Sequence, residues 1–120
     1  MGSGDMLQLK VGTHGLITVA ALTGEFDAAP QDDVVASLMA LVSNPGSRLA
    51  VDLSGVRGVD SSGLSMLMNV VARGRLNDCR VVLVGPSPFV AGVLHMTKLD
   101  TWFEIHANLD LAEKAMPKSS

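Results

Sequence analysis

The chain's fold is decided by the stretch Leu49-Ala-Val-Asp-Leu-Ser-Gly-Val-Arg-Gly-Val-Asp60-Ser61-Ser62-Gly63-Leu64. Leu49, Val51 and Leu53 alternate with other residues at its start, which indicates a strand. Its last residues place two serines at the beginning of an expected helix. A hydroxyl at that place can cap the helix or carry a phosphate, so this turn bears on function as well as on fold.

The helix that follows is predicted by four apolar residues at i, i+3, i+4 and i+7: Leu64, Leu67, Met68 and Val71. It is expected to run to about Leu76. Four residues should then point away from the core: Met66, Asn69, Val70 and Arg73. Because methionine adapts to irregular surfaces, this outer face beside Ser61 would form a docking patch for a partner, unless another helix of the domain covers it.

The segments on either side alternate between strands and helices. Residues 7–11 and 16–23 are apolar segments separated by Gly12-Thr-His-Gly15, which predicts a hairpin. A helix should begin at Pro30 and stop at Asn44-Pro45-Gly46. Later elements are a strand at 80–84 covered on both faces, a helix at 89–97, a possible edge strand at 102–105 and a helix at 109–116. This order predicts a single α/β domain with a mixed, mostly parallel sheet that starts with an antiparallel hairpin and is packed by about four helices.

Composition excludes several classes of protein. The 120 residues are 48% hydrophobic and 18% charged, which is typical of a folded domain. The net charge of −3 and the scattered lysines and arginines give no basic patch for nucleic acid. No apolar run approaches the roughly 20 residues that cross a bilayer, so membrane insertion is not expected.

The ends and the single cysteine suggest a cytoplasmic protein. Residues 1–6 lack the features of a signal peptide and are expected to form a flexible end, as are residues 117–120, with the domain at 7–116. Cys79 excludes an internal disulfide, and it precedes an apolar strand, so we expect a buried structural thiol.

Common catalytic signatures do not occur in the chain. It has no P-loop, and no glycine-rich dinucleotide fingerprint follows a strand. Ser61 and Ser62 lack the flanking glycines of a nucleophile elbow. His14, His95 and His106 lie in separate elements without metal-ligand spacing. We therefore expect no enzyme activity, no cofactor and no metal site.

The turn at Asp60-Ser61-Ser62-Gly63 is the remaining candidate site. An oxygen of Asp60 or of a serine should cap the helix, which is worth about 1 kcal/mol. Two adjacent hydroxyls exceed what one cap requires. Glycine in the first helical turn costs roughly 0.5–1 kcal/mol relative to alanine, so Gly63 suggests that something approaches the backbone closely.

Four segments of the chain resemble the STAS domains, specifically the anti-sigma-factor antagonists. They are Leu22-Thr-Gly-Glu-Phe-Asp27, the pair Val51-Asp-Leu-Ser-Gly-Val and Asp60-Ser-Ser-Gly-Leu64, Val81-Val-Leu-Val-Gly-Pro-Ser-Pro-Phe-Val90, and residues 99–105. The similarity covers nearly the whole chain, in order. Two departures bear on partner choice: Lys98 stands where the family often has glycine, and Gly58 replaces a bulky residue.

The resemblance implies a phosphorylation switch. Ser61 matches the phosphorylated serine of the antagonists, and Asp60 and Asp27 match acidic positions that border it. Together with Ser62, Gly63 and the outer helix face, they would bind a serine-kinase anti-sigma factor and release the sigma factor. Phosphate on Ser61 would end that binding, and a phosphoserine phosphatase would restore it.

The resemblance leaves one alternative within the same fold. The chain could be a STAS adaptor of another assembly, such as a stressosome or a lipid-transport complex, with Ser61 only a contact residue. In either case we expect a monomer or a weak dimer.

Overall fold

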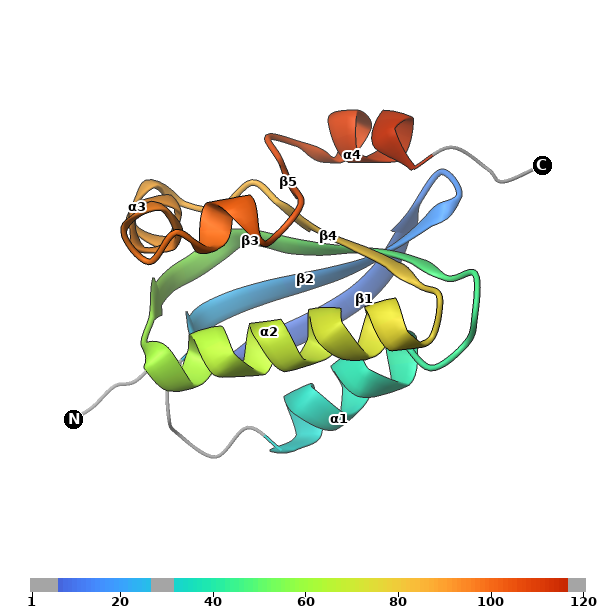
Figure 1. The fold of residues 1–120 in the computed structure, drawn as a ribbon, viewed down its shortest axis with the longest axis horizontal. Helices are drawn as coiled ribbons and strands as arrows, with labels where there is room; N and C mark the ends of the chain where they lie inside the picture. The colour runs from blue at the N-terminus through green and yellow to red at the C-terminus, as the bar shows by residue number, and fades with distance from the viewer. Residues whose placement is uncertain (1–6, 27–31, 117–120) are drawn as a thin grey trace.

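A computed structural model describes residues 7–26 and 32–116 (Figure 1). Its elements in chain order are β1 (Gln8–His14), β2 (Ile17–Phe26), α1 (Asp32–Leu41), β3 (Arg48–Val59), α2 (Ser61–Leu76), β4 (Arg80–Val84), α3 (Pro88–Met96), the 3-10 turn η1 (Leu99–Thr101), β5 (Ile105–His106) and α4 (Leu109–Ala115). The predicted α/β domain with an initial antiparallel hairpin and four helices is confirmed. The predicted flexible ends at 1–6 and 117–120, and the predicted helix start at Pro30, lie outside the described residues.

The strand order in the sheet is the same as the order in the chain, β1-β2-β3-β4-β5. β1 pairs with β2 antiparallel, and every later pair is parallel. Connections between parallel strands are nearly always right-handed, so successive steps in one direction are expected to place α1, α2 and α3 on the same face. All three helices contribute to one apolar core. In Figure 1, α1 and α2 lie below the sheet and α4 lies above it. The last helix therefore covers the opposite face.

Each face of the sheet has its own apolar core. The larger core contains Leu38 of α1, Leu67 of α2 and Leu94 of α3, all of which are at most 1% exposed. The smaller core lies between the sheet and α4 and comprises Ile17, Val19, Ala50, Val82, Val84, Ala112 and Met116. Alternate residues of β4 belong to the two cores, which confirms that this strand is covered on both faces.

The edge strand predicted at residues 102–105 is shorter and lies later in the chain. β5 holds only Ile105 and His106. Trp102 and Phe103 instead form an edge-to-face pair, with ring centroids 4.9 Å apart. Phe103 is buried in the larger core, and the Arg75 guanidinium lies 4.3 Å from the centroid of the Trp102 ring. The aromatic residues thus make a packed corner, because burial of their rings outweighs their preference for a strand.

Cys79 is a buried thiol, as predicted. Its Sγ lies 3.0 Å from the Asn44 carbonyl oxygen and 3.3 Å from that of Val42. Among the described residues, no helix combines the length and apolarity that a membrane span requires.

Candidate functional site

Asp60 is the N-cap of α2. Its Oδ1 accepts a hydrogen bond from the Gly63 N–H at 2.9 Å, and its carbonyl accepts from the Leu64 N–H at 2.9 Å. The sequence left open whether Asp60 or a serine would supply the cap, and the structure assigns it to Asp60. Ser61 is then the first residue of the helix. Its hydroxyl is not needed as the capping acceptor for the N–H groups of the first turn.

Gly63 is required by a close approach within the chain itself. A Cβ on Gly63 would overlap the carbonyl group of Phe26, the last residue of β2. The Asp60 N–H donates to that same Phe26 oxygen at 3.2 Å. The expectation that something approaches this backbone is correct, but it is the end of β2 that does so. This contact fixes the first turn of α2 against the sheet.

Ser61 and Ser62 are both exposed. In the part of the chain that the structure describes, neither hydroxyl takes part in a hydrogen bond. A side chain at this place can be modified without the loss of a contact that holds the fold. The helix N-terminus also favours negative charge locally, because its first N–H groups point outward.

A second carboxylate lies near the end of β2, beside the last residues of β3 that lead into this turn. Glu25 pairs with Gly58 in the parallel ladder of β2 and β3, and a Cβ on Gly58 would lie 4.0 Å from the Glu25 Cδ. Both Glu25 and Asp60 are exposed. Glu25 was not predicted from the sequence, although the parallel pairing of two strands that end together could have revealed it. Asp27, which was expected here, lies outside the described residues.

The predicted outer face of α2 is partly wrong. Val70 is fully buried, and Met66 is half-buried and packs against the larger core. Asn69 and Arg73 are exposed, as predicted. The reason is that α2 contacts both the sheet and α1, so its buried arc extends toward Gly63, Val70 and Gly74. The alternative prediction, that another helix of the domain covers this side of α2, is correct for Val70.

From Ser61 to Arg73, the exposed face of α2 is therefore polar. This face begins at Ser61, the residue expected to carry the phosphate. It continues along one side of the helix through Ser62, Ser65, Asn69 and Arg73. The apolar docking patch predicted from the sequence is reduced to the exposed part of Met66. A partner at this face would be held mainly by polar contacts.

The family model described as "Mlab, STAS domain" matches residues 11–110. A comparison with curated protein sequences gave no match.

Solved structures match the fold over nearly its whole length. An anti-sigma factor antagonist from Mycobacterium paratuberculosis is 26% identical, with a TM-score of 0.81, 97% of this chain covered and 98% of that one. The antagonist SpoIIAA is 18% identical in its unphosphorylated form, with a TM-score of 0.68, 92% of this chain covered and 96% of that one. Its phosphorylated form, from Bacillus, is 17% identical, with a TM-score of 0.64 and coverage of 92% and 99%.

A part of an anion transporter also has this fold. The murine anion transporter Slc26a9 is 16% identical, with a TM-score of 0.71. The match covers 84% of this chain but only 18% of the transporter. The same fold thus occurs as a separate protein and as part of a larger one.

Proposed function

Because the chain belongs to the STAS domain family, we propose that it acts as an anti-sigma factor antagonist controlled by phosphorylation of Ser61. The unmodified domain binds a serine-kinase anti-sigma factor and releases the sigma factor. One observation carries this proposal: Ser61 is exposed at the start of α2, while Asp60 performs the capping that the helix needs. The similarity to the Mycobacterium paratuberculosis antagonist supports it.

The effect of the phosphate follows from local charge. Phosphoserine carries about −1.5 to −2 charges at neutral pH. The helix N-terminus accommodates this charge, so the fold should change little. Two exposed carboxylates, Asp60 and Glu25, already lie at this edge of the sheet. Phosphate on Ser61 would add to this negative charge. A partner that binds the unmodified surface would therefore bind the phosphorylated one more weakly.

The remaining parts of the switch rest on the family resemblance. Asp27 would add a third carboxylate beside the phosphate. Ser62, Met66, Asn69 and Arg73 would contact the partner, and the Gly63 backbone would hold Ser61 in place against β2. A phosphoserine phosphatase would reset the switch, and both enzymes would act in the cytoplasm. SpoIIAA, solved in both forms, is a protein of this fold that exists with and without the phosphate.

The proposal is tested by phosphosite mapping after incubation with ATP and each serine-kinase anti-sigma factor of the organism that encodes the chain. We expect phosphate on Ser61 in the wild type and in Ser62→Ala, the matched control, and none in Ser61→Ala. Phosphate on Ser62 alone, or on neither serine with any kinase that binds, would contradict the switch.

Binding measurements on the same kinases provide a second test. Ser61→Ala should bind like the wild type, whereas Ser61→Asp should bind about 5- to 150-fold more weakly, which corresponds to a coupling of about 1–3 kcal/mol. Ser62→Asp controls for charge placed one residue away and should have a smaller effect.

A second candidate function is that of an adaptor in another assembly. The occurrence of this fold within the transporter Slc26a9 favours it. An adaptor that uses Ser61 only as a contact residue would bind its partner equally well as Ser61→Ala and as Ser61→Asp. Equal binding of the two variants therefore separates the adaptor from the phosphorylation switch.

A further inference from the structure

Three histidines of the chain each lie near a carboxylate, and one of them differs from the others. His95 Nδ1 is 3.0 Å from a single carboxylate, that of Asp100. His106 Nε2 is 2.9 Å from Glu104, a carboxylate that Arg80 already holds through two hydrogen bonds. His14 instead faces two carboxylates, those of Asp110 and Glu113.

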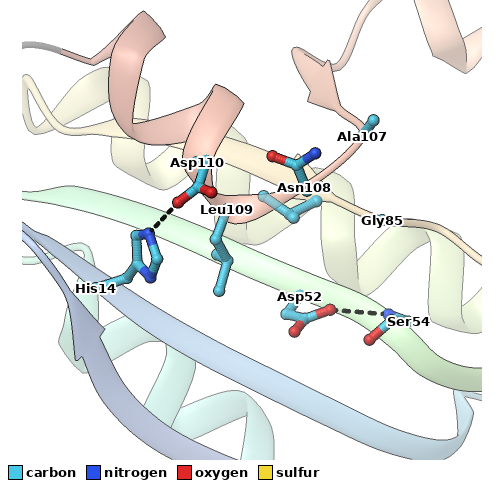
Figure 2. A pocket seen from close by; sticks show the side chains of 9 residues that line it. His14, Asp52, Ser54, Gly85, Ala107, Asn108, Leu109 and Asp110 are labelled. Atoms are coloured by element: carbon cyan, nitrogen blue, oxygen red, sulfur yellow. Dashed lines mark hydrogen bonds and ion pairs between the residues drawn. The ribbon is translucent and has the colours of Figure 1, made fainter.

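The His14 cluster brings together the end of β1 and the helix α4. His14 Nε2 lies 2.9 Å from Asp110 Oδ1 and 3.6 Å from Glu113 Oε1. One ligand atom from each of the three residues lies within 4.8 Å of the others. His14 ends β1, whereas Asp110 and Glu113 are three residues apart and share one face of α4. Figure 2 shows His14 and Asp110 pointing toward one another.

The hairpin turn is shaped to admit the Glu113 carboxylate. Gly15 follows His14 and has φ +63°, and a Cβ at this position would overlap the Glu113 carboxylate. Any other residue at this position would therefore require the end of the Glu113 side chain to shift. The His14 side chain is 34% exposed and that of Glu113 is 38% exposed, so both are partly withdrawn from water.

A histidine alone does not balance this cluster. Two carboxylates carry two negative charges, and a protonated imidazole supplies one positive charge. Within the described residues, the ion pairs of Asp110 and Glu113 run to His14. Even a protonated imidazole would leave one negative charge of the cluster unbalanced. A divalent cation would neutralise both carboxylates with one ion.

We propose that His14, Asp110 and Glu113 form a binding site for a divalent transition metal of the Zn²⁺ type. One imidazole nitrogen and two carboxylate oxygens are ligands that Zn²⁺ accepts, and three protein ligands leave a coordination position for water or another molecule. The metal would add a polar link between α4 and the β1–β2 hairpin, which already share the smaller apolar core.

The proposed metal site borders a cavity. His14 and Asp110 lie on the rim of a cavity of about 310 Å³ that extends between α4 and the sheet toward Asp52 and Ser54 (Figure 2). A small molecule that coordinates the metal would have space there. The cavity lies on the α4 face, whereas α2 and Ser61 belong to the other face, so this proposal is independent of the proposed function.

The test is a titration of the chelator-treated 120-residue chain with ZnCl₂, followed by calorimetry and thermal unfolding. We expect one ion per chain. At a free Zn²⁺ concentration of about 100 times Kd, Tm should rise by about 10 °C. Hydrogen exchange in α4 should also slow, because the metal would join this helix to the hairpin.

Variants separate the proposed site from other Zn²⁺ ligands. Glu113→Gln keeps the size of the side chain and should weaken binding at least about 10-fold, and His14→Ala should abolish it. His95→Ala, which removes the histidine with a single carboxylate, is the matched control and should bind like the wild type. No binding to the wild type, unchanged binding to Glu113→Gln, or equal loss in His95→Ala would overturn the proposal.

Discussion

The two faces of the sheet are held together in different ways. On the larger face, helices α1, α2 and α3 pack apolar side chains closely, and a Cβ on Gly74 would lie only 2.6 Å from Val81 Cγ2. On the α4 side the apolar core is small, and polar groups supplement it. Arg48 Nη1 donates to the Met116 carbonyl at 3.1 Å, and His14 pairs with Asp110.

This difference determines what each face responds to. Close packing on the larger face makes its stability depend on side-chain volume. Charged and polar contacts on the α4 side, and at the edge strand β5, respond to pH, salt and bound ions. Substitutions and changes of pH should therefore affect the two regions unequally.

The largest difference is expected from truncation of one buried residue on each face. Leu67 is 1% exposed in the larger core, and Leu67→Ala should lower the free energy of unfolding by about 3–4 kcal/mol. Met116 is 2% exposed at the end of α4, and Met116→Ala should cost about 2 kcal/mol, because the last turn of this short helix can relax into the space. Urea unfolding measures the free energy of unfolding of both variants. Equal losses would contradict the difference in packing between the two faces.

Gly63 tests how tightly the larger face is packed at the Ser61 turn. Gly63→Ala should lower the free energy of unfolding by about 2 kcal/mol, because the new methyl group meets the Phe26 backbone. A methyl group added at Gly92 in α3 would have no neighbouring atom within 4 Å, so Gly92→Ala is the control and should stabilise by about 0.5–1 kcal/mol. Thermal unfolding in which both variants shift the same way would contradict the packing assigned to Gly63.

The contribution of the Asp60 hydrogen bond to stability can be separated from that of the Asp60 charge. Asp60→Ala removes the acceptor for the Gly63 N–H and should cost about 1 kcal/mol, whereas Asp60→Asn keeps an acceptor oxygen and should cost less than half of that. Unfolding by urea measures the cap. If both variants lose the same stability, the carboxylate charge and not the hydrogen bond holds the turn.

The smallest effect is expected from pH at the edge strand. Hydrogen bonds from Arg80 hold the pKa of Glu104 below its ordinary value of 4.5. The stabilisation from this pair is therefore fully present above pH 4.5 and is lost as the pH falls through the lower pKa of the folded state. Because both side chains are partly exposed, we expect a loss of about 0.5 kcal/mol. In Glu104→Gln, the loss of stability at acid pH should be smaller by this amount. If the free energy of unfolding of this variant depends on pH as that of the wild type does, the role assigned to Glu104 is contradicted.

Local sequence patterns predicted the elements of the larger face well. The alternation of Leu49, Val51 and Leu53 indicated β3, and the spacing from Leu64 to Val71 indicated α2, because each pattern reflects one buried side of one element. The Asp60 cap and the burial of Cys79 were likewise local properties. The burial of Val70 was not, because it depends on α1, a helix that the periodicity of α2 does not describe.

Contacts between distant segments could not be predicted from local patterns. His14 and Asp110 are 96 residues apart, and only the return of α4 over the sheet brings them together. The spacing of the histidines alone therefore predicted no metal ligands. Trp102 and Phe103 have side chains that favour strands. Their contact with each other and the stacking of Arg75 on Trp102 instead place them in a turn before β5. In each case a tertiary contact outweighed the local preference.

The identity of strand order and chain order has a consequence for synthesis on the ribosome. Each new strand emerges beside a partner that has already left the exit tunnel, so the sheet can grow one strand at a time. Among the described elements, α4 is the one that must return to the first hairpin, and that docking has to wait until α4 has left the exit tunnel. We expect arrested nascent chains that lack residues 107–120 to resist protease across α1 and α2 while the β1–β2 turn is still cleaved.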